Sequence, residues 1–356
     1  MFENPEIFHN ILRTWYLKHK RDLPWREQVS PYLIWLSEII LQQTRVDQGL
    51  PYYFKFIAKY PTIFDLAAAS EEEVLKLWQG LGYYSRARNL HATARKIANE
   101  RNGHFPDTYA ELKKLKGIGD YTASAIASIC FNEPTAVVDG NVYRVLSRIF
   151  GISTPVNSTA GIKEFKALAQ RLIDRADPGT FNQAIMEFGA RHCVPQNPDC
   201  TSCVFAANCE ALRIGAVRDL PVKLAKKPLR KRYFNYIVML SEEHDSTWLR
   251  QRNGKGIWQQ LYEFPLVETE KEVSVQELKE HEDYKELCRD LCVEELTLYN
   301  EEAIVHKLSH QHINTRFWIV RTNNSDEKAV PFSEIANYPV PVLIENFISE
   351  FPVFKN

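Results

Sequence analysis

The segment Leu115–Val145, LKGIGDYTASAIASICFNEPTAVVDGNVYRV, decides how the rest of the chain is interpreted. It opens with Gly117-Ile118-Gly119, where two glycines allow a tight turn with exposed backbone N–H groups. The small residues from Thr122 to Cys130 predict a closely packed helix directly after this turn. Free N–H groups at a turn and a helix N-terminus attract anions, so a phosphate would suit this place. The motif by itself also occurs in many ordinary loops and nucleotide sites.

Asp139 stands just before a second helix in the same segment. That helix is predicted by the apolar spacing of Val142, Val145 and Ile149. Considered alone, Asp139 is best interpreted as an ordinary helix N-cap. A dinucleotide-binding fold is disfavoured, because the third glycine is missing and Glu111–Lys116 has a helical pattern.

Composition predicts a soluble globular protein of about two domains, with 356 residues, 45% hydrophobic and 25% charged. No apolar run approaches the roughly 18 residues of a membrane span, and the first ten residues lack a signal-peptide pattern. The expected location is therefore cytoplasmic, associated with the nucleoid. The net charge is +6 over residues 1–229 and −7 over residues 230–356, so the front half suits a polyanionic partner.

Glu38 lies in the middle of Pro31–Thr44, a segment that is apolar nearly all round and predicts a buried helix. An ionised carboxylate there is costly unless it is paired, so the pKa of Glu38 is expected to be raised. A raised pKa suits a general acid that works near neutral pH. The alternative is a glutamate at the helix rim, paired with a nearby arginine.

Two short segments, Arg21–Arg26 and Gly80–Arg88, mix cations with aromatic side chains. In Gly80–Arg88, stackable rings beside cations and flexible glycines are suited to invading a DNA duplex, and a helix–helix turn with a solvated basic face is an equally good alternative. A surface loop with Trp25 tucked inward explains Arg21–Arg26 equally well. Nothing before residue 230 alternates with period two, so the front half is predicted to be all-α.

Four of the seven cysteines crowd into residues 193–209, with spacing C-x6-C-x2-C-x5-C. They are Cys193, Cys200, Cys203 and Cys209. Such a group predicts a metal site, since a disulfide framework is improbable in an intracellular chain of this size. Zinc remains an alternative, although structural zinc sites usually show two close cysteine pairs.

The C-terminal part has a different character. Residues 218–231 predict a basic linker, and the strand patterns at Tyr233–Leu240 and Phe317–Val320, with a helix at Gln276–Cys292, predict an α+β domain over 232–356. Gly256–Pro265 resembles the Nudix (MutT-like) fold. The magnesium-binding run R-E-x-x-E-E should follow there in a working hydrolase and is missing. The domain is therefore expected to bind rather than hydrolyse.

Taken together, these motifs resemble a known family. The hairpin motif and V-V-D-G-N-V-Y-R-V resemble the helix-hairpin-helix DNA glycosylases, and the cysteine spacing matches the 4Fe–4S loop of the endonuclease III-like members. With the Nudix-like tail, the whole chain looks like the MutY family of adenine DNA glycosylases. The resemblance implies an all-α glycosylase domain at 1–217, which includes the cluster loop, and an 8-oxoguanine recognition domain at 232–356.

The resemblance also implies the chemistry of base excision. Glu38 would protonate an extruded adenine, and Asp139 would stabilise or capture the oxocarbenium-like sugar. Tyr121 and Asn141 would position these groups. Tyr121 stands where endonuclease III carries its Schiff-base lysine, so a monofunctional enzyme is expected. The residues matching the adenine pocket are Arg21, Leu23, Trp25, Arg26 and Gln183.

The implied partner is double-stranded DNA with adenine opposite 8-oxoguanine or guanine, bound by a monomer without membrane contact. The matching DNA-binding residues are Gln43, Thr44, Tyr83, Gly117, Gly119, Leu308, Ser309 and His310. Leu308 replaces the aromatic residue of the family's Phe-Ser-His loop, which predicts weaker stacking on the lesion. Two other interpretations of this segment are a polar loop and a metal site on His306, His310 and His312. Backbone carbonyls of Lys113, Leu115 and Ile118 would hold a sodium or calcium ion at the hairpin.

Three other functions remain open at this point. A silent mismatch-binding module would not need two costly carboxylates, and an endonuclease III-like bifunctional glycosylase/lyase would need an amine in the site. A Nudix hydrolase with a helical appendage would need the missing magnesium carboxylates.

Overall fold

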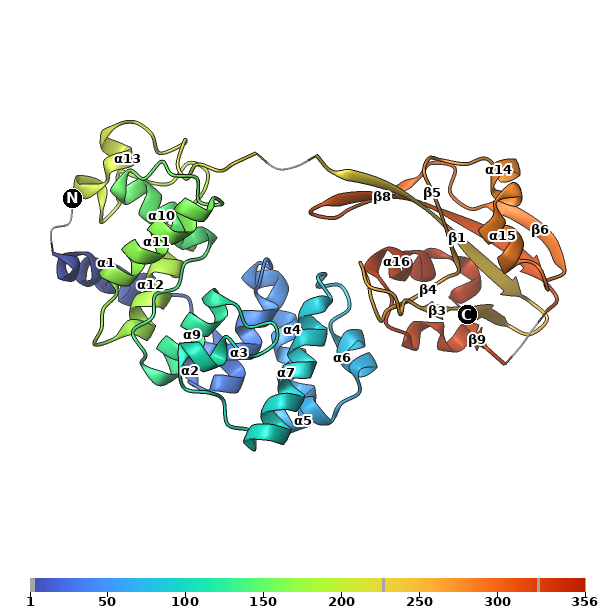
Figure 1. Cartoon of the computed structure of the whole chain (residues 1–356), viewed down its shortest axis with the longest axis horizontal. Helices are drawn as coiled ribbons and strands as arrows, with labels where there is room; N and C mark the ends of the chain where they lie inside the picture. The colour runs from blue at the N-terminus through green and yellow to red at the C-terminus, as the bar shows by residue number, and fades with distance from the viewer. Residues whose placement is uncertain (1–3, 226–227, 325–326, 356) are drawn as a thin grey trace. The chain divides into compact units, whose positions relative to one another are not determined.

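The computed structural model describes residues 4–225, 228–324 and 327–355 (Figure 1). The chain divides into two compact units, one of residues 1–68 and 89–226 and the other of residues 69–88 and 227–356. Residues 226 and 227 of the predicted linker lie outside the described ranges. In the ranges that are described, no helix is both long and apolar enough to cross a membrane.

The first unit is helical, as the sequence predicts. Its helices are α1 (Pro5–His19), α2 (Pro24–Glu27), α3 (Pro31–Ile40), α4 (Val46–Lys59), α5 (Ile63–Ala68), most of α7 (Ser85–Arg101), α8 (Tyr109–Leu112), α9 (Asp120–Phe131), α10 (Gly140–Phe150), α11 (Thr159–Leu172), α12 (Pro178–Arg191) and α13 (Glu210–Arg213), with the 3-10 turn η1 (Ala206–Asn208). No strand occurs among described residues 4–225.

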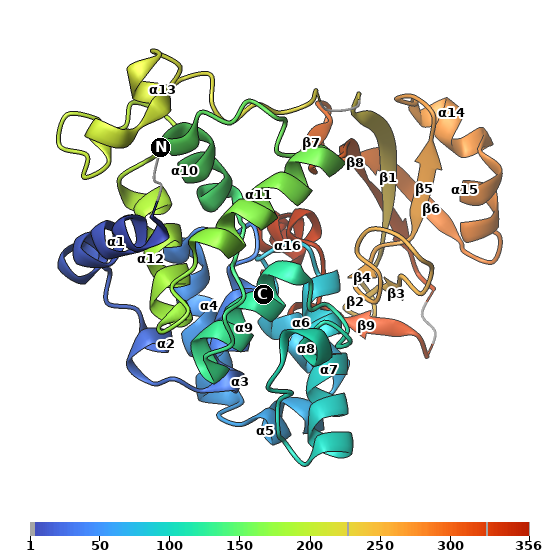
Figure 2. The ribbon, with the colours of Figure 1, turned by 60° about the vertical axis from the view of Figure 1, so that its left-hand side comes forward.

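The core of this unit lies where α12 packs beside α1 and α10, as both overall views show (Figures 1 and 2). The apolar stripe of α10, including Val142 and Val145, is fully buried there. Phe188 of α12 meets Phe205 edge to face with ring centroids 5.2 Å apart, so the segment after α12 is anchored in the same core.

Three predicted helices differ from those in the structure. The helix expected over Pro31–Thr44 ends at Ile40 and is followed by a turn in which Gln43 has φ 56°, a left-handed conformation that cannot continue an α-helix. The helix expected to lead into the hairpin shrinks to α8. The helix expected over Gln276–Cys292 is broken at His281, whose extended backbone separates α14 (Val275–Glu280) from α15 (Glu282–Leu287).

The second unit combines a short helical segment with a mixed sheet. Helix α6 (Glu71–Leu77) begins at a capping box, in which Ser70 and Glu73 each bond the other's backbone N–H. The strands are β1 (Arg230–Ser241), β2 (Ser246–Trp248), β3 (Arg250–Gln251), β4 (Tyr262–Glu263), β5 (Leu266–Thr269), β6 (Val293–Leu298), β7 (Ile304–Lys307), β8 (Gln311–Thr322) and β9 (Ala329–Pro331). The 3-10 turns η2 (Phe332–Asn337) and η3 (Pro352–Phe354) flank α16 (Val342–Glu350).

Strands β1 and β8 run parallel at the centre of this sheet, with Tyr236 paired to Phe317 and Ile237 to Trp318. Because side chains alternate along a strand, the two pairs face opposite sides. Ile237 and Trp318 pack with α14 and α15, whereas Phe317 stacks on Phe347 of α16 with the ring centroids 4.0 Å apart. Figure 1 shows these three helices beside the sheet. The sheet is therefore covered by helices on both faces, which confirms the α+β class.

Candidate active site

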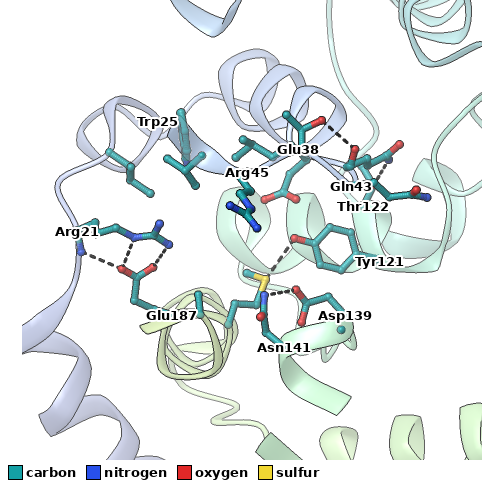
Figure 3. A pocket seen from close by; sticks show the side chains of 18 of the residues that line it. Arg21, Trp25, Glu38, Gln43, Arg45, Tyr121, Thr122, Asp139, Asn141 and Glu187 are labelled. Carbon is teal, nitrogen blue, oxygen red and sulfur yellow. Dashed lines mark hydrogen bonds and ion pairs between the residues drawn. The ribbon is translucent and has the colours of Figure 1, made fainter. Parts of the chain in front are cut away.

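A cavity of about 1080 Å³ opens in the helical unit. Its walls come from α2, the turn after α3, and the starts of α9 and α10, with α12 closing one side (Figure 3). It is lined by many residues singled out from the sequence: Arg21, Leu23, Trp25, Arg26, Glu38, Gln43, Thr44, Gly119, Tyr121, Asp139 and Asn141. Segments more than 100 residues apart in sequence therefore contribute to one space.

Glu38 enters this cavity from α3 among buried Ile, Leu and Trp side chains. Burial raises the pKa of its carboxyl to about 7, with the nearby negative charge of Asp139 adding to the rise. A hydrogen bond with Tyr121 and the charge of Arg26 act in the opposite direction but are outweighed. The alternative of a rim glutamate neutralised by an arginine is not what the structure has. Glu38 can hold a proton at neutral pH.

Asp139 is both the N-cap of α10 and a wall of the cavity. Its Oδ1 accepts from the Val142 N–H at 2.8 Å, and its Oδ2 accepts from Asn141 Nδ2 at 2.9 Å. Burial still raises the pKa of Asp139, although both hydrogen bonds favour the ionised form. The plain N-cap and the functional interpretation are thus compatible, since the cap fixes the carboxylate at the cavity wall.

The extended segment before Asp139 is held by Asn182, a fully buried side chain of α12. Asn182 Oδ1 accepts from the Val137 N–H at 3.0 Å, and Nδ2 donates to Thr135 O at 2.8 Å and Ser128 Oγ at 2.9 Å. Because the segment leading into α10 cannot shift without breaking these bonds, Asn182 helps to fix where Asp139 lies.

Tyr121 projects from the first turn of α9 into the space between the two carboxyl groups (Figure 3). Its hydroxyl lies 3.2 Å from Met186 Sδ and also interacts with Glu38. Burial, with the charges of Glu38 and Asp139, raises the pKa of Tyr121 well above its ordinary value. The phenol is therefore neutral at ordinary pH, and its hydroxyl can donate a hydrogen bond to a neighbouring carboxyl group.

Glu187 on α12 also lines the cavity and was not singled out from the sequence. Its Oε1 accepts from Arg21 N and Nε at 3.0 and 2.7 Å, and its Oε2 accepts from Arg21 Nη2 at 2.9 Å (Figure 3). The same Oε2 also accepts from Arg26 Nη2 at 2.9 Å. Burial alone would raise the pKa of Glu187, but these bonds and charges lower it to about 2. A carboxylate accepts about four hydrogen bonds, and all four are taken by the arginines.

Gln183, one turn before Glu187, is not among the residues that line the cavity. Its Oε1 accepts from the Tyr16 hydroxyl at 2.8 Å, which ties α12 to α1. The place of Gln183 in an adenine pocket, which the resemblance implies, stays a prediction. The other four residues of that set, Arg21, Leu23, Trp25 and Arg26, lie together at the cavity wall.

The turn after α3 places Gln43, Thr44 and Arg45 at the cavity. Gln43 is exposed and left-handed, a conformation that costs energy for a residue with a side chain. Figure 3 shows that Arg45, not singled out from the sequence, points into the cavity. In the second unit Tyr83 is also left-handed, with φ 49°, and is 47% exposed, so its ring is available to a ligand.

The predicted hairpin turn forms between α8 and α9. Gly117 has φ 78°, and a Cβ there would lie 2.7 Å from Asn89 Cβ, so glycine is required by both conformation and space. Gly119 is the extended N-cap of α9, where any residue could stand. Among the carbonyls expected to hold a cation, that of Leu115 accepts from the Ile118 N–H at 3.2 Å, so the turn is closed by its own backbone.

The four clustered cysteines lie in the segment after α12 and form no disulfide. Burial, together with the charges of the other three cysteines, raises the pKa of Cys203 to about 11, so the four lie near one another. In the described ranges, no three His, Cys, Asp or Glu side chains converge closely enough to hold a metal ion.

Two of these four sulfurs accept hydrogen bonds. The Phe205 N–H donates to Cys203 Sγ at 3.4 Å, and Arg148 Nη1 donates to Cys193 Sγ at 3.5 Å. One turn earlier on α10, Arg144 donates to both Asn141 Oδ1 and the carbonyl of Cys193. Donors aimed at sulfur favour thiolates, which are the ligands of iron–sulfur clusters.

In the second unit, Leu308, Ser309 and His310 form the turn of a hairpin between β7 and β8, directly before the strand that contains Phe317. Ser309 and His310 are exposed at this turn, with Ser309 Oγ 3.4 Å from His310 Nδ1. His306 is half-buried against Trp258, and no metal-binding group of histidines occurs in the described part of the chain. The metal interpretation of this segment is not supported.

Both parts of the chain are similar to known protein families. Residues 36–188 match the family described as HhH-GPD superfamily base excision DNA repair protein, and residues 236–350 match the NUDIX domain. The chain is 48% identical over 213 residues to the human adenine DNA glycosylase, covering 57% of this chain and 39% of that protein. It is 34% identical over 311 residues to the adenine DNA glycosylase of Buchnera aphidicola, covering 86% of this chain and 85% of that protein.

The chain thus spans less than half the length of the human relative that it matches. Among solved structures, a thermostable thymine-DNA glycosylase superposes with a TM-score of 0.55 at 30% identity, over 59% of this chain and 97% of that one.

Proposed function

The chain belongs to the adenine DNA glycosylase family, and on that premise we propose that it is a monofunctional enzyme of base excision repair. The reaction is hydrolysis of the N-glycosidic bond of an adenine paired with 8-oxoguanine or guanine. The observation that carries the proposal is the cavity itself, which holds two carboxyl groups with raised pKa values and no lysine among its described lining residues.

Glu38 is the general acid of this mechanism. With its pKa near 7, a large fraction is protonated at neutral pH, and it can protonate the five-membered ring of an extruded adenine. Protonation turns adenine into a neutral leaving group. Tyr121 lies beside Glu38 and positions its carboxyl group through the hydrogen bond between them.

Asp139 acts on the sugar. As the base leaves, the sugar develops positive charge, which a fixed carboxylate stabilises or captures by forming a bond. Its bonds to the Val142 N–H and to Asn141 hold the carboxylate in place, so little reorganisation is needed as charge develops. Arg21, Leu23, Trp25 and Arg26 form the wall that receives the base.

The proposal excludes a lyase step for a chemical reason. A lyase needs a neutral amine that attacks the sugar, and the cations at this cavity are arginines, which do not lose their protons. Tyr121 stands at the position that a Schiff-base lysine would occupy in the endonuclease III-like alternative.

The second unit is proposed to recognise the base opposite adenine through the turn Leu308–His310. It is not proposed to hydrolyse nucleotides. Glu268, the nearest carboxylate after the Nudix-like segment, accepts both Nε and Nη2 of Arg232 at 2.6 Å and is not free for magnesium. Both oxygens of Glu263 accept from Arg252 Nη1 at 2.6 Å.

Cys193, Cys200, Cys203 and Cys209 are proposed to bind a 4Fe–4S cluster. Each thiolate would bind a separate iron, so the four sulfurs need not converge on one point. When bound, the cluster would tie the segment after α12 together by four iron–sulfur bonds. The carbonyls of Lys113, Leu115 and Ile118 are proposed to face a sodium or calcium ion when DNA is bound. The domain boundaries 1–217, 218–231 and 232–356 belong to the same proposal.

The test is a single-turnover assay on a duplex with one adenine opposite 8-oxoguanine, divided into alkali-treated and untreated halves. Strand cleavage only after alkali is the expected result, because excision without a lyase leaves an intact abasic strand. Cleavage in the untreated half would restore the endonuclease III-like alternative. No cleavage in either half would favour the silent mismatch-binding module.

A further inference from the structure

A cluster of charged side chains beside the hairpin turn takes no part in the excision chemistry. It joins Lys113, which follows α8, Asp120 at the start of α9, and Lys166 on α11, around the ring of Tyr109. Lys113 Nζ lies 2.5 Å from Asp120 Oδ1, and the Tyr109 hydroxyl donates to the same oxygen at 2.6 Å. Lys166 Nζ donates to the Tyr109 hydroxyl at 3.0 Å and lies 3.8 Å from Asp120 Oδ2.

The two ammonium groups are gathered at one place by these contacts. Both lie over the Tyr109 ring, at 5.5 Å for Lys113 and 5.2 Å for Lys166, within the range of cation–π attraction. The hydrogen bonds from Lys113 and Tyr109 lower the pKa of Asp120, so it is ionised. With two cations and one anion, the cluster carries one net positive charge.

The cluster lies at the rim of the active-site cavity. Asp120 and its neighbour Gly119 both line that cavity, on the side of the hairpin turn. The side chains of Lys113 and Lys166 remain 43% and 46% exposed. Exposed ion pairs contribute little to the free energy of folding. Stabilisation of the fold therefore does not explain why charged residues gather here. A ligand that approaches the cavity can reach both ammonium groups.

We propose that Lys113 and Lys166 bind a backbone phosphate of double-stranded DNA beside the hairpin turn, with Asp120 and Tyr109 holding the two ammonium groups together. The inference rests on the proposed function, since it needs DNA to approach this face of the helical unit. Asp120 positions the lysines but also cancels one of their charges. Removing Asp120 is therefore expected to strengthen DNA binding, which a purely structural ion pair would not do.

The test uses the salt dependence of binding to an undamaged duplex, measured with the full chain by fluorescence anisotropy. Each neutralised phosphate contributes about −0.9 to the slope of log K against log salt. Lys166→Met leaves the cluster with no net charge, so the slope should become shallower by about 0.9 and affinity should fall about eightfold at 0.1 M salt. Asp120→Asn gives a net charge of two and should tighten binding by a similar factor.

The double variant Asp120→Asn/Lys166→Met restores one net positive charge through Lys113. Its slope and affinity should return close to those of the wild-type protein. An unchanged slope in Lys166→Met, weaker binding in Asp120→Asn, or a double variant no better than Lys166→Met would each overturn the proposal.

Lys96 and Glu100 on α7 provide the matched control. They form an exposed pair at 3.8 Å, Lys96 is 47% exposed, and neither lines the cavity. Lys96→Met and Glu100→Gln change the net charge of the protein by the same amounts as Lys166→Met and Asp120→Asn. If the control variants shifted the slope equally, the effect would be one of overall charge, and the phosphate contact would be rejected.

An excision assay distinguishes a failure of the proposed phosphate contact from a failure of the proposed enzyme activity. At saturating enzyme, Lys166→Met should excise adenine opposite 8-oxoguanine at the wild-type rate, because the lysine does not reach the reacting atoms. Normal excision with no slope change would reject the phosphate contact alone. A slope change in a protein that excises nothing would reject the proposed enzyme activity and keep the phosphate contact.

Discussion

Glu38 and Glu187 face the same cavity from different helices, yet their surroundings move their pKa values in opposite directions (Figure 3). Glu38 on α3 has no arginine bonded to it, and burial raises its pKa to about 7. Glu187 on α12 is also buried, but two arginines saturate its carboxylate and lower its pKa to about 2. Burial therefore raises the pKa of a carboxyl group here only where no bonded cation offsets it.

The difference assigns separate tasks to the two sides of the cavity. The α3 side holds a proton that can be given away at neutral pH. The α12 side holds a permanent charge that fixes Arg21 and Arg26 and, through them, the segment carrying Trp25. The two carboxyl groups should therefore respond differently to substitution and to pH.

Glu38→Gln should reduce adenine release by about 10² to 10⁴-fold, the usual contribution of general acid catalysis. Glutamine keeps the shape of the side chain but cannot give up a proton. Binding to the mismatched duplex should be unchanged, and single-turnover excision with a parallel binding titration measures both. Release at the wild-type rate would show that the proton comes from elsewhere.

Glu187→Gln should lower the free energy of unfolding at pH 7 by roughly 3 kcal/mol, because it leaves two arginines at the wall without their anion. The pKa of Glu187 is lowered in the folded state, so its contribution is present above about pH 4.5 and is lost as pH falls through about 2. Glu38→Gln should change the free energy of unfolding in the opposite direction and stabilise the protein. Folding raises the pKa of Glu38, so the wild-type protein loses stability between about pH 4.5 and 7, and the glutamine variant avoids this loss.

Urea denaturation of both variants at pH 5 and pH 8 measures this contrast. Glu100→Gln on α7 is the control for loss of an exposed carboxylate. Equal effects of the two cavity variants, or a stabilised Glu187→Gln, would contradict the assignment.

The excision rate should fall as pH rises through about 7, by up to tenfold for each further unit, because only protonated Glu38 can donate. Glu187 stays ionised over this range and should add no second change. A single-turnover pH profile measures it, with Glu38→Gln as the reference that should lack this limb. A rate that increases above pH 7 would require Glu38 to act as a base.

Gln183→Ala should have the smallest effect, less than about tenfold on excision and about 1 kcal/mol on stability. The loss is that of the hydrogen bond from Tyr16, since Gln183 does not line the cavity. Single-turnover excision and thermal melting measure the two quantities. A loss of excision comparable to that of Glu38→Gln would mean that Gln183 turns toward the base when DNA binds.

Much of this site can be predicted from local sequence. A carboxylate inside the apolar Pro31–Ile40 run and a capping Asp139 before an amphipathic helix are both visible without coordinates. The end of α3 is not visible, because the left-handed turn at Gln43 opposes the helical pattern that continues to Thr44. Glu187 is also missed, since it is one charged residue on an ordinary amphipathic helix.

The sequence by itself determined the helical class of the front part, the α+β class of the rest, the spacing of the four clustered cysteines and the positions of two candidate carboxyl groups. These depend on periodicity and spacing within one segment, which a linear chain displays directly. Only the tertiary structure decided which carboxyl groups have cationic partners. Glu187 meets arginines that are 161 and 166 residues away, while Glu38 meets none at bonding distance. A pKa responds to charges within a few ångströms, and no local pattern records which distant segments come that close.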